Sequence, residues 1–151
     1  MTVIFSRRRL LATSVGAVAA AAWMGSIVPA AANDAHDRIA KFTGGKQPVT
    51  GKVKLDMPEI AENGNTVPMS ITVDSPMTEQ SHVTDVLVVA DGNPNGGVVT
   101  FHFTPMSGVA EANTRIRLAK TQTVTVIAKS SDGALYSASK EIKVTIGGCG
   151  G

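Results

Sequence analysis

The sequence predicts an all-β fold, namely an immunoglobulin-like antiparallel β-sandwich with a short N-terminal helix and a flexible C-terminal glycine arm. Three observations lead to this prediction. Apolar residues recur at every second position from Val49 onward, turn-forming residues interrupt this pattern at intervals, and no helical segments alternate with the predicted strands. Strands without crossover helices are typical of antiparallel sandwiches. The 151 residues suffice for one such domain.

The helix is predicted directly before the first strand. Asn33 or Asp34 can cap it, and Ala35, Ile39 and Phe42 follow at i, i+4 and i+7 spacing, which puts them on one face. Gly44 is a suitable end for a helix of one or two turns.

Alternating residues predict two strands in the first half of the domain, and a third segment, from Val83 to Ala90, is apolar almost throughout. Such a run is typical of a central strand that is covered on both faces. The predicted inward residues of the first two strands are Val49, Val53, Leu55 and Met57, then Val67, Met69, Ile71 and Val73.

Four further strands are predicted in the second half, with turns at 91–97 and 130–133. In the last strand, Glu141, Lys143 and Thr145 are expected to face solvent. The predicted inward residues of the four strands are, in order, Val99, Phe101 and Phe103; Thr114, Ile116 and Leu118; Val124, Val126 and Ala128; and Ile142, Val144 and Ile146.

The first 32 residues have the pattern of an export signal. Arg7 and Arg8, followed by Arg9, precede an apolar, alanine-rich run that ends in small residues. Paired arginines in this place indicate the twin-arginine route to the periplasm, and cleavage is expected after Ala32. The alternative is a membrane anchor, but the run is weakly hydrophobic for its length. We therefore predict a cleaved signal at 1–32 and a sandwich domain at 33–146.

Removal of this signal changes the charge of the protein. The whole chain has 14 Lys and Arg residues against 12 Asp and Glu, and loss of three arginines leaves 11 against 12, or about −1. The mature protein therefore lacks the positive field of a nucleic-acid binder.

The chain has one cysteine, Cys149, in a terminal segment at 147–151. It follows the last predicted strand position, and the flanking glycine pairs Gly147-Gly148 and Gly150-Gly151 have no side chains to cover it, so we expect an exposed thiol. Three residues of extended chain let its Cα reach about 10 Å beyond Ile146. The alternatives are a frayed tail with an incidental cysteine, and a disulfide between two chains.

Nothing in the tail activates the thiol. An ordinary thiol has a pKa near 8.5, so only a small fraction is thiolate at neutral pH. Lys143 is the nearest base in sequence, and an extended strand directs it away from the arm. We therefore expect partner proteins to activate Cys149, which is typical of a carrier and not of a catalyst.

The C-terminal sequence Val144-Thr145-Ile146-Gly147-Gly148-Cys149-Gly150-Gly151, at the end of an exported β-rich domain, resembles the SoxY family. The resemblance spans essentially the whole chain. It implies that Cys149 is the covalent attachment site for thiosulfate-derived sulfur, that Gly147 to Gly151 form the carrier arm, and that the protein uses no cofactor.

The same resemblance implies several partners. They are a SoxZ-like subunit that forms a heterodimer, a haem enzyme that couples thiosulfate to the thiol, a dimanganese enzyme that releases sulfate by hydrolysis, and a sulfane dehydrogenase. Folding with SoxZ before export would explain a twin-arginine signal.

Other classes of function fit less well. His36, His82 and His102 suggest a copper carrier, together with the methionines Met57, Met69, Met77 and Met106, but neither His nor Met follows Cys149 as in blue-copper sites. The methionines are instead expected to point into the core. The C-terminal Gly150-Gly151 pair is shared with ubiquitin-like sulfur carriers, which mix helix with sheet. Hydrolase motifs are absent. An exported structural domain with a disulfide-forming tail cysteine remains an alternative.

Overall fold

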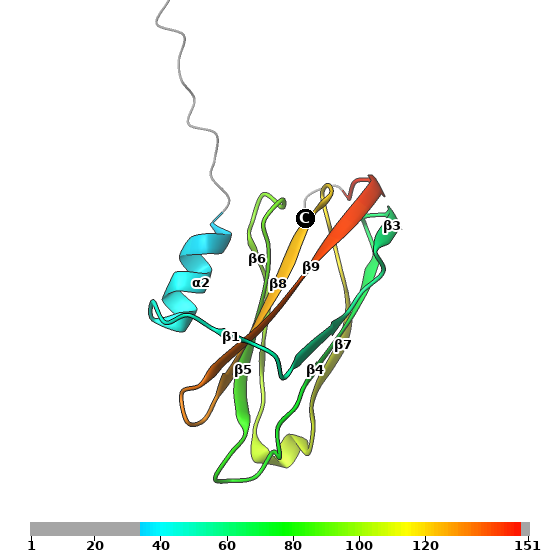
Figure 1. Cartoon of the computed structure of the whole chain (residues 1–151). Coiled ribbons are helices and arrows are strands. Elements are labelled where there is room, and N and C mark those ends of the chain that lie inside the picture. Colours follow the sequence, from blue (N-terminus) through cyan, green and yellow to red (C-terminus); the bar gives the residue numbers. More distant parts are fainter. Residues whose placement is uncertain (1–33, 149–151) are drawn as a thin grey trace, which may run out of the picture. The chain divides into compact units, whose positions relative to one another are not determined.

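The computed structural model describes residues 34–148, which form two packed β-sheets with one α-helix beside them (Figure 1). The first sheet has the strand order β1-β9-β8-β5-β6, with β3 also pairing with β9, and the second has the order β2-β4-β7. The elements are α2 (Ala35–Thr43), β1 (Val49–Thr50), β2 (Val53–Asp56), β3 (Ile60–Asn63), β4 (Val67–Val73), β5 (Val83–Ala90), β6 (Gly97–His102), the 3₁₀ helix η2 (Pro105–Ser107), β7 (Ala110–Ile116), β8 (Gln122–Ser130) and β9 (Leu135–Ile146).

This architecture confirms the predicted β-sandwich. The longer strand pairs are all antiparallel. The two short strands β1 and β3, however, run parallel to β9. An antiparallel arrangement throughout was therefore a simplification, because the chain visits the outer edge of β9 twice and crosses to the second sheet in between.

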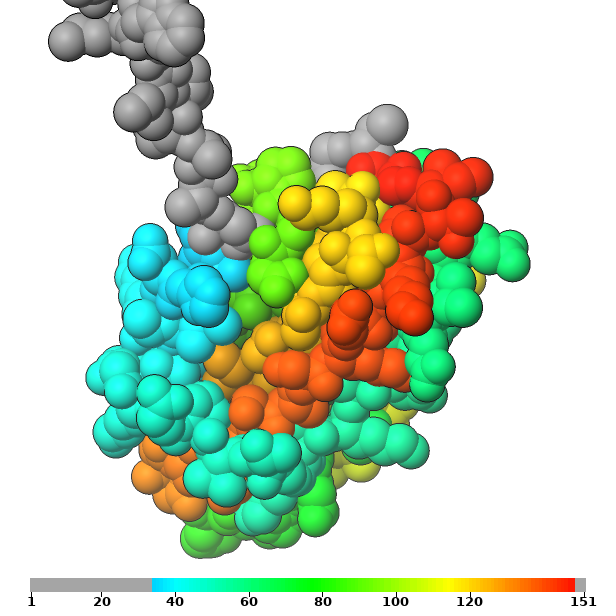
Figure 2. All heavy atoms as spheres, turned by 45° about the horizontal axis from the view of Figure 1, so that its top comes forward, coloured from blue at the N-terminus to red at the C-terminus, as the bar shows by residue number. Residues whose placement is uncertain are grey.

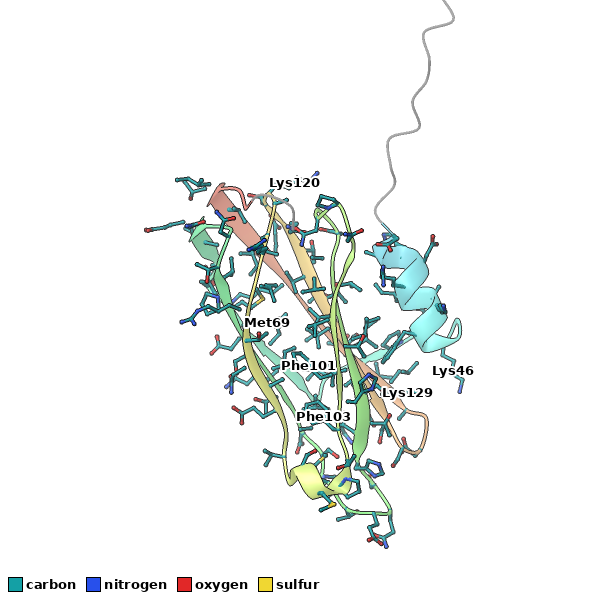
Figure 3. All side chains as sticks on the ribbon, turned by 180° about the vertical axis from the view of Figure 1, so that it is seen from behind. Lys46, Met69, Phe101, Phe103, Lys120 and Lys129 are labelled. Atoms are coloured by element: carbon teal, nitrogen blue, oxygen red, sulfur yellow. The ribbon has the colours of Figure 1, made fainter. Side chains whose placement is uncertain are left out.

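The core lies between the two sheets. Alternate residues of β4 point inward, and Met69 and Ile71 are only 2% and 1% exposed. Val86 and Val88 face them from β5 and are fully buried. Figure 3 shows Met69 with Phe101 and Phe103 inside the sandwich. The predicted alternation in β4 is thus confirmed, and the predicted inward residues of β8, Val124, Val126 and Ala128, are fully buried.

Helix α2 covers the other face of β5. Ala35, Ile39 and Phe42 pack against Leu87 and Val89, which alternate with the inward residues of β5. The helix ends at Gly44, whose N–H donates to the Ala40 carbonyl, and its left-handed backbone (φ 62°) lets the Gly45 N–H reach the same carbonyl at 3.2 Å. Both the predicted helix and the two-sided burial of β5 are confirmed. None of the helices formed by the described residues is long and apolar enough to span a bilayer.

The first predicted strand is wrong as a single element. Gly51 and Lys52 have positive φ angles of 123° and 57° and break it into β1 and β2, which belong to different sheets. Val49 is consequently 64% exposed. Strand β3 was not predicted, since Ile60–Asn63 has no regular alternation and pairs only through the distant β9.

Three other inward assignments are also wrong. Thr114 is exposed, because inward packing on β7 is confined to its ends and to Leu118 beyond it. Ile146 is 66% exposed, because it lies at the end of the sandwich where the facing sheet no longer covers it. Met106, on η2, is 97% exposed and does not belong to the core, unlike Met57, Met69 and Met77.

Candidate functional site

The predicted site residues fall into two groups. Cys149, Gly150 and Gly151 lie outside the described residues, as do Arg7 and Arg8 of the signal. Gly147 and Gly148 are described and directly follow β9. The site can therefore be built up to the residue before the cysteine.

Gly148 is buried, and its N–H makes the first of three successive hydrogen bonds that link three chain segments. Its N–H donates to the Leu118 carbonyl at 2.9 Å, and the Leu118 N–H donates to the Gly64 carbonyl at 2.8 Å. The Gly64 N–H in turn donates to the Ile146 carbonyl at 2.7 Å. The end of β9, the turn after β3 and the loop after β7 thus meet through their backbones.

This meeting point leaves no room for side chains. A Cβ atom on Gly148 would lie 2.6 Å from the Gly64 carbonyl oxygen, and one on Gly147 would lie 2.1 Å from the Ala119 oxygen. A Cβ on Gly64 would lie 2.1 Å from the Leu118 oxygen. We call Gly64, Gly147 and Gly148, with the backbone of Leu118 and Ala119, the glycine junction. Here glycine allows close packing between backbones.

Two buried polar side chains hold the loop that carries Leu118. Asn93 and Gln122 are each 5% exposed. Asn93 accepts a hydrogen bond from the Ala119 N–H at 2.9 Å and donates to the Arg117 carbonyl at 2.9 Å. Gln122 donates to Asn93 at 2.8 Å and to the Lys120 carbonyl at 3.1 Å. Because buried amides are costly to leave unpaired, this network fixes the loop.

The same loop is anchored to the core through its side chains. Leu118 is completely buried in the main cluster. The Val144 N–H donates to the Thr121 hydroxyl at 3.0 Å, which ties the loop to β9 a second time. The last described residue before Cys149 is therefore attached to a rigid part of the sandwich.

Basic residues near this end differ from those considered in the sequence. The backbone N–H of Lys143 donates to the backbone carbonyl of Glu59 at 2.9 Å, next to β3, and the Lys143 side chain is exposed. Lys120 lies in the loop beside the glycine junction, and its side chain passes close to Gly92. A Cβ atom added to Gly92 would lie 3.0 Å from the Cε of Lys120. Figure 3 shows Lys120 at the same end of the sandwich as the end of β9. Spacing along the chain did not reveal this lysine.

The histidines do not form a metal site. His82 Nδ1 lies 3.1 Å from the Thr78 carbonyl, while His102 Nδ1 lies 2.6 Å from Asp85 Oδ1 and its side chain is 75% exposed. His36 is exposed on α2. Within residues 34–148, no group of three or more His, Cys, Asp or Glu side chains could hold a metal ion. The described residues thus provide no ligand set for a copper carrier.

Sequence reasoning missed Gly64, Asn93 and Gln122. Gly64 lies in the turn Asn63-Gly64-Asn65, which is a local turn signal without any indication that β9 passes close by. Asn93 and Gln122 are 29 positions apart, and only the fold brings their side chains together.

Comparison with known proteins identifies the class. The family model described as "Sulfur oxidation protein SoxY" matches residues 39–149 and so includes the terminal cysteine. The structure of the sulfur carrier protein SoxY from Chlorobium limicola f. thiosulfatophilum is 32% identical, covers 74% of this chain and 96% of its own, and superimposes with a TM-score of 0.60. The protein is therefore a sulfur carrier of sulfur oxidation and not a catalyst. It belongs to the SoxY family.

Other solved structures share the fold alone. A superoxide reductase (neelaredoxin) from Ignicoccus hospitalis is 19% identical, with a TM-score of 0.56 over 62% of this chain and 80% of its own. A putative superoxide reductase from Thermotoga maritima is 20% identical, with a TM-score of 0.52 over 68% and 89%. No curated protein sequence matches the chain significantly.

Proposed function

We propose that Cys149 carries sulfur intermediates covalently and presents them to the other enzymes of the Sox system in the periplasm. The observation that carries this proposal is the family match, which extends through Cys149, together with a glycine junction that brings the chain to the end of the sandwich directly before it. The chain has no second cysteine with which Cys149 could form an internal disulfide.

The chemistry of such a carrier begins with two steps. In the first, the Cys149 thiolate and thiosulfate (S₂O₃²⁻) form an S–S bond to give a thiosulfonate adduct, R–S–S–SO₃⁻, and the two electrons released go to the haem enzyme. In the second, water cleaves the terminal S–S bond, which gives R–S–S⁻, sulfate and two protons. The dimanganese enzyme performs this hydrolysis. A sulfane dehydrogenase then oxidises the remaining sulfur with three water molecules, which gives R–S–SO₃⁻ and six protons and passes six electrons to that enzyme.

This chain's own contribution is to hold the sulfur intermediate and to position it for the partner enzymes. Neither step needs a base from the sandwich, because the activating groups belong to the partner enzymes. The arm must instead be narrow enough to enter recessed active sites, and glycines on both sides of the cysteine keep it narrow.

We also propose that a SoxZ-like subunit binds the side of the sandwich where β6 and β7 end the two sheets. Each of these strands pairs with only one neighbour among the described strands. The connection between them exposes Met106 and Val109, which are 97% and 63% exposed. Free strand edges and exposed apolar side chains are common features of protein interfaces.

The twin-arginine route is part of the same proposal. Export of a folded heterodimer lets a subunit without a signal leave the cytoplasm with the signal-bearing one. We propose that residues 1–32 are that signal and are removed after Ala32.

Mass spectrometry of the native tail tests the carrier function. Protein from cells that oxidise thiosulfate should contain sulfur adducts on the C-terminal peptide at Cys149. Cys149→Ser should abolish thiosulfate-dependent turnover in the reconstituted system while changing the free energy of unfolding by less than about 0.5 kcal/mol. Full turnover by Cys149→Ser, or a tail found only as free thiol or as a disulfide between two chains, would contradict the proposal.

Co-purification tests the partner surface. Met106→Glu should weaken binding of a SoxZ-like subunit, because it places a charge in an apolar contact. Val49→Glu, at the opposite edge of the first sheet and 64% exposed, is the matched control and should bind normally. If both variants bound the SoxZ-like subunit equally well, the β6–β7 side would not be the interface.

A further inference from the structure

We infer that the outer face of the first sheet carries a non-covalent binding site for a doubly charged oxyanion, of the class of sulfate, thiosulfate and phosphate, held by Lys41, Lys46 and Lys129. This site goes beyond the carrier function proposed above, because it involves neither Cys149 nor a covalent bond to the ligand. It is formed by the end of α2, the turn that follows the helix, and the hairpin between β8 and β9.

The site is a pocket of about 450 Å³ between these elements. One wall is the last turn of α2 with the glycine turn behind it, and the other is the end of β8 with the start of β9. Thr43 and Leu135 are each only 7% exposed, and Phe42 is half-buried. The pocket therefore has a floor of buried side chains whose positions the fold fixes.

Three lysines line this pocket. Lys41 lies in the last turn of α2, Lys46 follows the helix, and Lys129 is in the last turn-proximal part of β8, with all three side chains exposed. Figure 3 shows Lys46 and Lys129 near the end of α2. The chain beyond residue 32 has 11 Lys and Arg against 12 Asp and Glu. The concentration of positive charge in this pocket is therefore a local feature.

The carboxylates around these lysines are bound elsewhere. Asp85 lies directly across from Lys129 in the register of β5 and β8, but its Oδ1 lies 2.6 Å from His102 Nδ1. Asp132 accepts a hydrogen bond from the backbone of its own turn at 2.9 Å. Within residues 34–148, none of the three lysines forms an ion pair with Asp37 or with another carboxylate. Their positive charge is left for a ligand to neutralise.

The charge and the size of the pocket favour a small ion with two negative charges. Each ammonium group is a compact, strongly hydrated charge on a flexible four-carbon chain, so the three side chains can close around an ion that enters the pocket with part of its hydration shell. The carbonyl groups at the end of a helix attract cations and repel anions. The lysines, and not the helix backbone, must therefore hold the ligand, and an ion with a single charge would be held more weakly.

The pocket lies far from the glycine junction. Leu135 begins β9 and Ile146 ends it, and an extended strand of this length spans about 36 Å. Figure 1 shows the hairpin before β9 and the end of β9 at opposite ends of the first sheet. Binding of an ion in the pocket is therefore compatible with contact between a partner and the glycine junction.

NMR titration of the Cys149→Ser protein tests this site with sodium sulfate, sodium thiosulfate and sodium phosphate, at a pH where phosphate is doubly charged. Ionic strength is kept constant with NaCl. We expect saturable shifts of the backbone amides of Gly44 and Gly133, which line the pocket, with a Kd of about 10 mM or tighter. Because this variant lacks the thiol, cysteine chemistry cannot contribute. A preference among the three salts would identify the natural ion.

Lysine variants in the same Cys149→Ser protein test which side chains hold the ion. Lys46→Gln and Lys129→Gln should each weaken binding up to about fivefold, and the double variant should abolish the saturable shifts. Lys54→Gln is the matched control, because it removes the same charge from an exposed position of β2 in the second sheet. It should bind the ions as the parent protein does.

Two results would overturn the inference. One is a set of shifts that stay linear in ion concentration, and the other is an equal loss of binding in the double variant and in Lys54→Gln. The three lysines would then be ordinary solvated surface charges. Either result leaves the carrier function untouched, since adducts and turnover at Cys149 decide that function separately.

Discussion

Asp34 ties the beginning of α2 to the hairpin between β5 and β6. Its Oδ1 accepts a hydrogen bond from the Gly96 N–H at 2.7 Å, and its Oδ2 accepts one from Arg38 Nε at 2.6 Å. The Gly96 N–H and then the Arg38 side chain hold the pKa of this carboxyl below its ordinary value of 3.8. Both hydrogen bonds favour the charged form, so Asp34 links α2 to the hairpin as a carboxylate. We call this pair of hydrogen bonds the Asp34 clamp.

The contribution of the Asp34 clamp to the stability of the protein should depend on pH. A carboxyl whose pKa is lower in the folded state stabilises the fold above its unfolded pKa, and loses that effect as the pH falls through the folded value. We expect wild type to melt at a higher temperature than Asp34→Asn near neutral pH. The difference should shrink as the pH falls below 3.8. If the difference in melting temperature did not change with pH, the shape of the Asp34 side chain and not its charge would explain the stabilisation.

Two isoleucines on β9 show how much burial depends on position along a strand. Ile142 is fully buried, whereas Ile146 is 66% exposed on the same strand. Period-two alternation places both on the inward face, and this much the sequence does predict. It does not predict where the facing sheet ends, because that depends on how β4 and β7 are placed.

Truncation of Ile142 and of Ile146 should lower the stability of the protein by clearly different amounts. Ile142→Ala should lower the free energy of unfolding by about 3 kcal/mol, through lost burial and a new cavity. Ile146→Ala should change it by less than about 0.5 kcal/mol. Denaturant unfolding measures both, and a large loss for Ile146→Ala would mean that this residue is buried, which the fold does not show.

At the scale of elements, α2 is the part that sequence reasoning described most completely. Its apolar face and its end at Gly44 are local signals, and both are confirmed. Asp34 takes the N-cap position, but its side chain makes no capping hydrogen bond and binds Gly96 and Arg38 instead. The short strands β1 and β3 are the opposite case. Each is defined by its pairing with β9, at positions between 83 and 87 residues later in the chain, and no local pattern records such a pairing.

Removing the apolar face of α2 should destabilise the sandwich without affecting the carrier chemistry. Phe42 is half-buried against Leu87 and Val89, so Phe42→Ala should cost about 2 kcal/mol, less than a fully buried phenylalanine. Lys41→Ala, one position earlier and exposed, is the control and should be neutral. Turnover of the folded Phe42→Ala protein should equal that of wild type. A clearly lower turnover would contradict this prediction and would indicate that α2 contacts a partner enzyme.

At the scale of the whole molecule, this chain has the fold found in superoxide reductases but belongs to a family of sulfur carriers. The fold therefore does not define the function, whereas the family match identifies a sulfur carrier. The terminal cysteine with its glycines was visible in the sequence. The glycine junction was not, because it joins segments around positions 64, 118 and 148 that come together only in the folded chain.

We do not expect metal ions to stabilise the part of the chain that the structure describes. Since residues 34–148 contain no group of ligands suited to a metal, added Fe²⁺ or Cu²⁺ should shift the melting temperature of the Cys149→Ser variant by less than about 1 °C. This variant excludes binding by the thiol itself. A clear, saturable increase would show a site that the described side chains do not reveal.

The place of β9 has a consequence for how the protein is made. It is the last strand of the described chain, and it pairs with β8 along its length and with β1 and β3 on its other edge (Figure 1). Figure 2 shows its residues wedged between earlier segments. Because synthesis proceeds from the N-terminus, the sheet stays open until this strand leaves the ribosome. A nascent chain can therefore complete its sandwich only after β9 has left the ribosome, so products truncated before the end of β9 lack both the closing strand and the thiol.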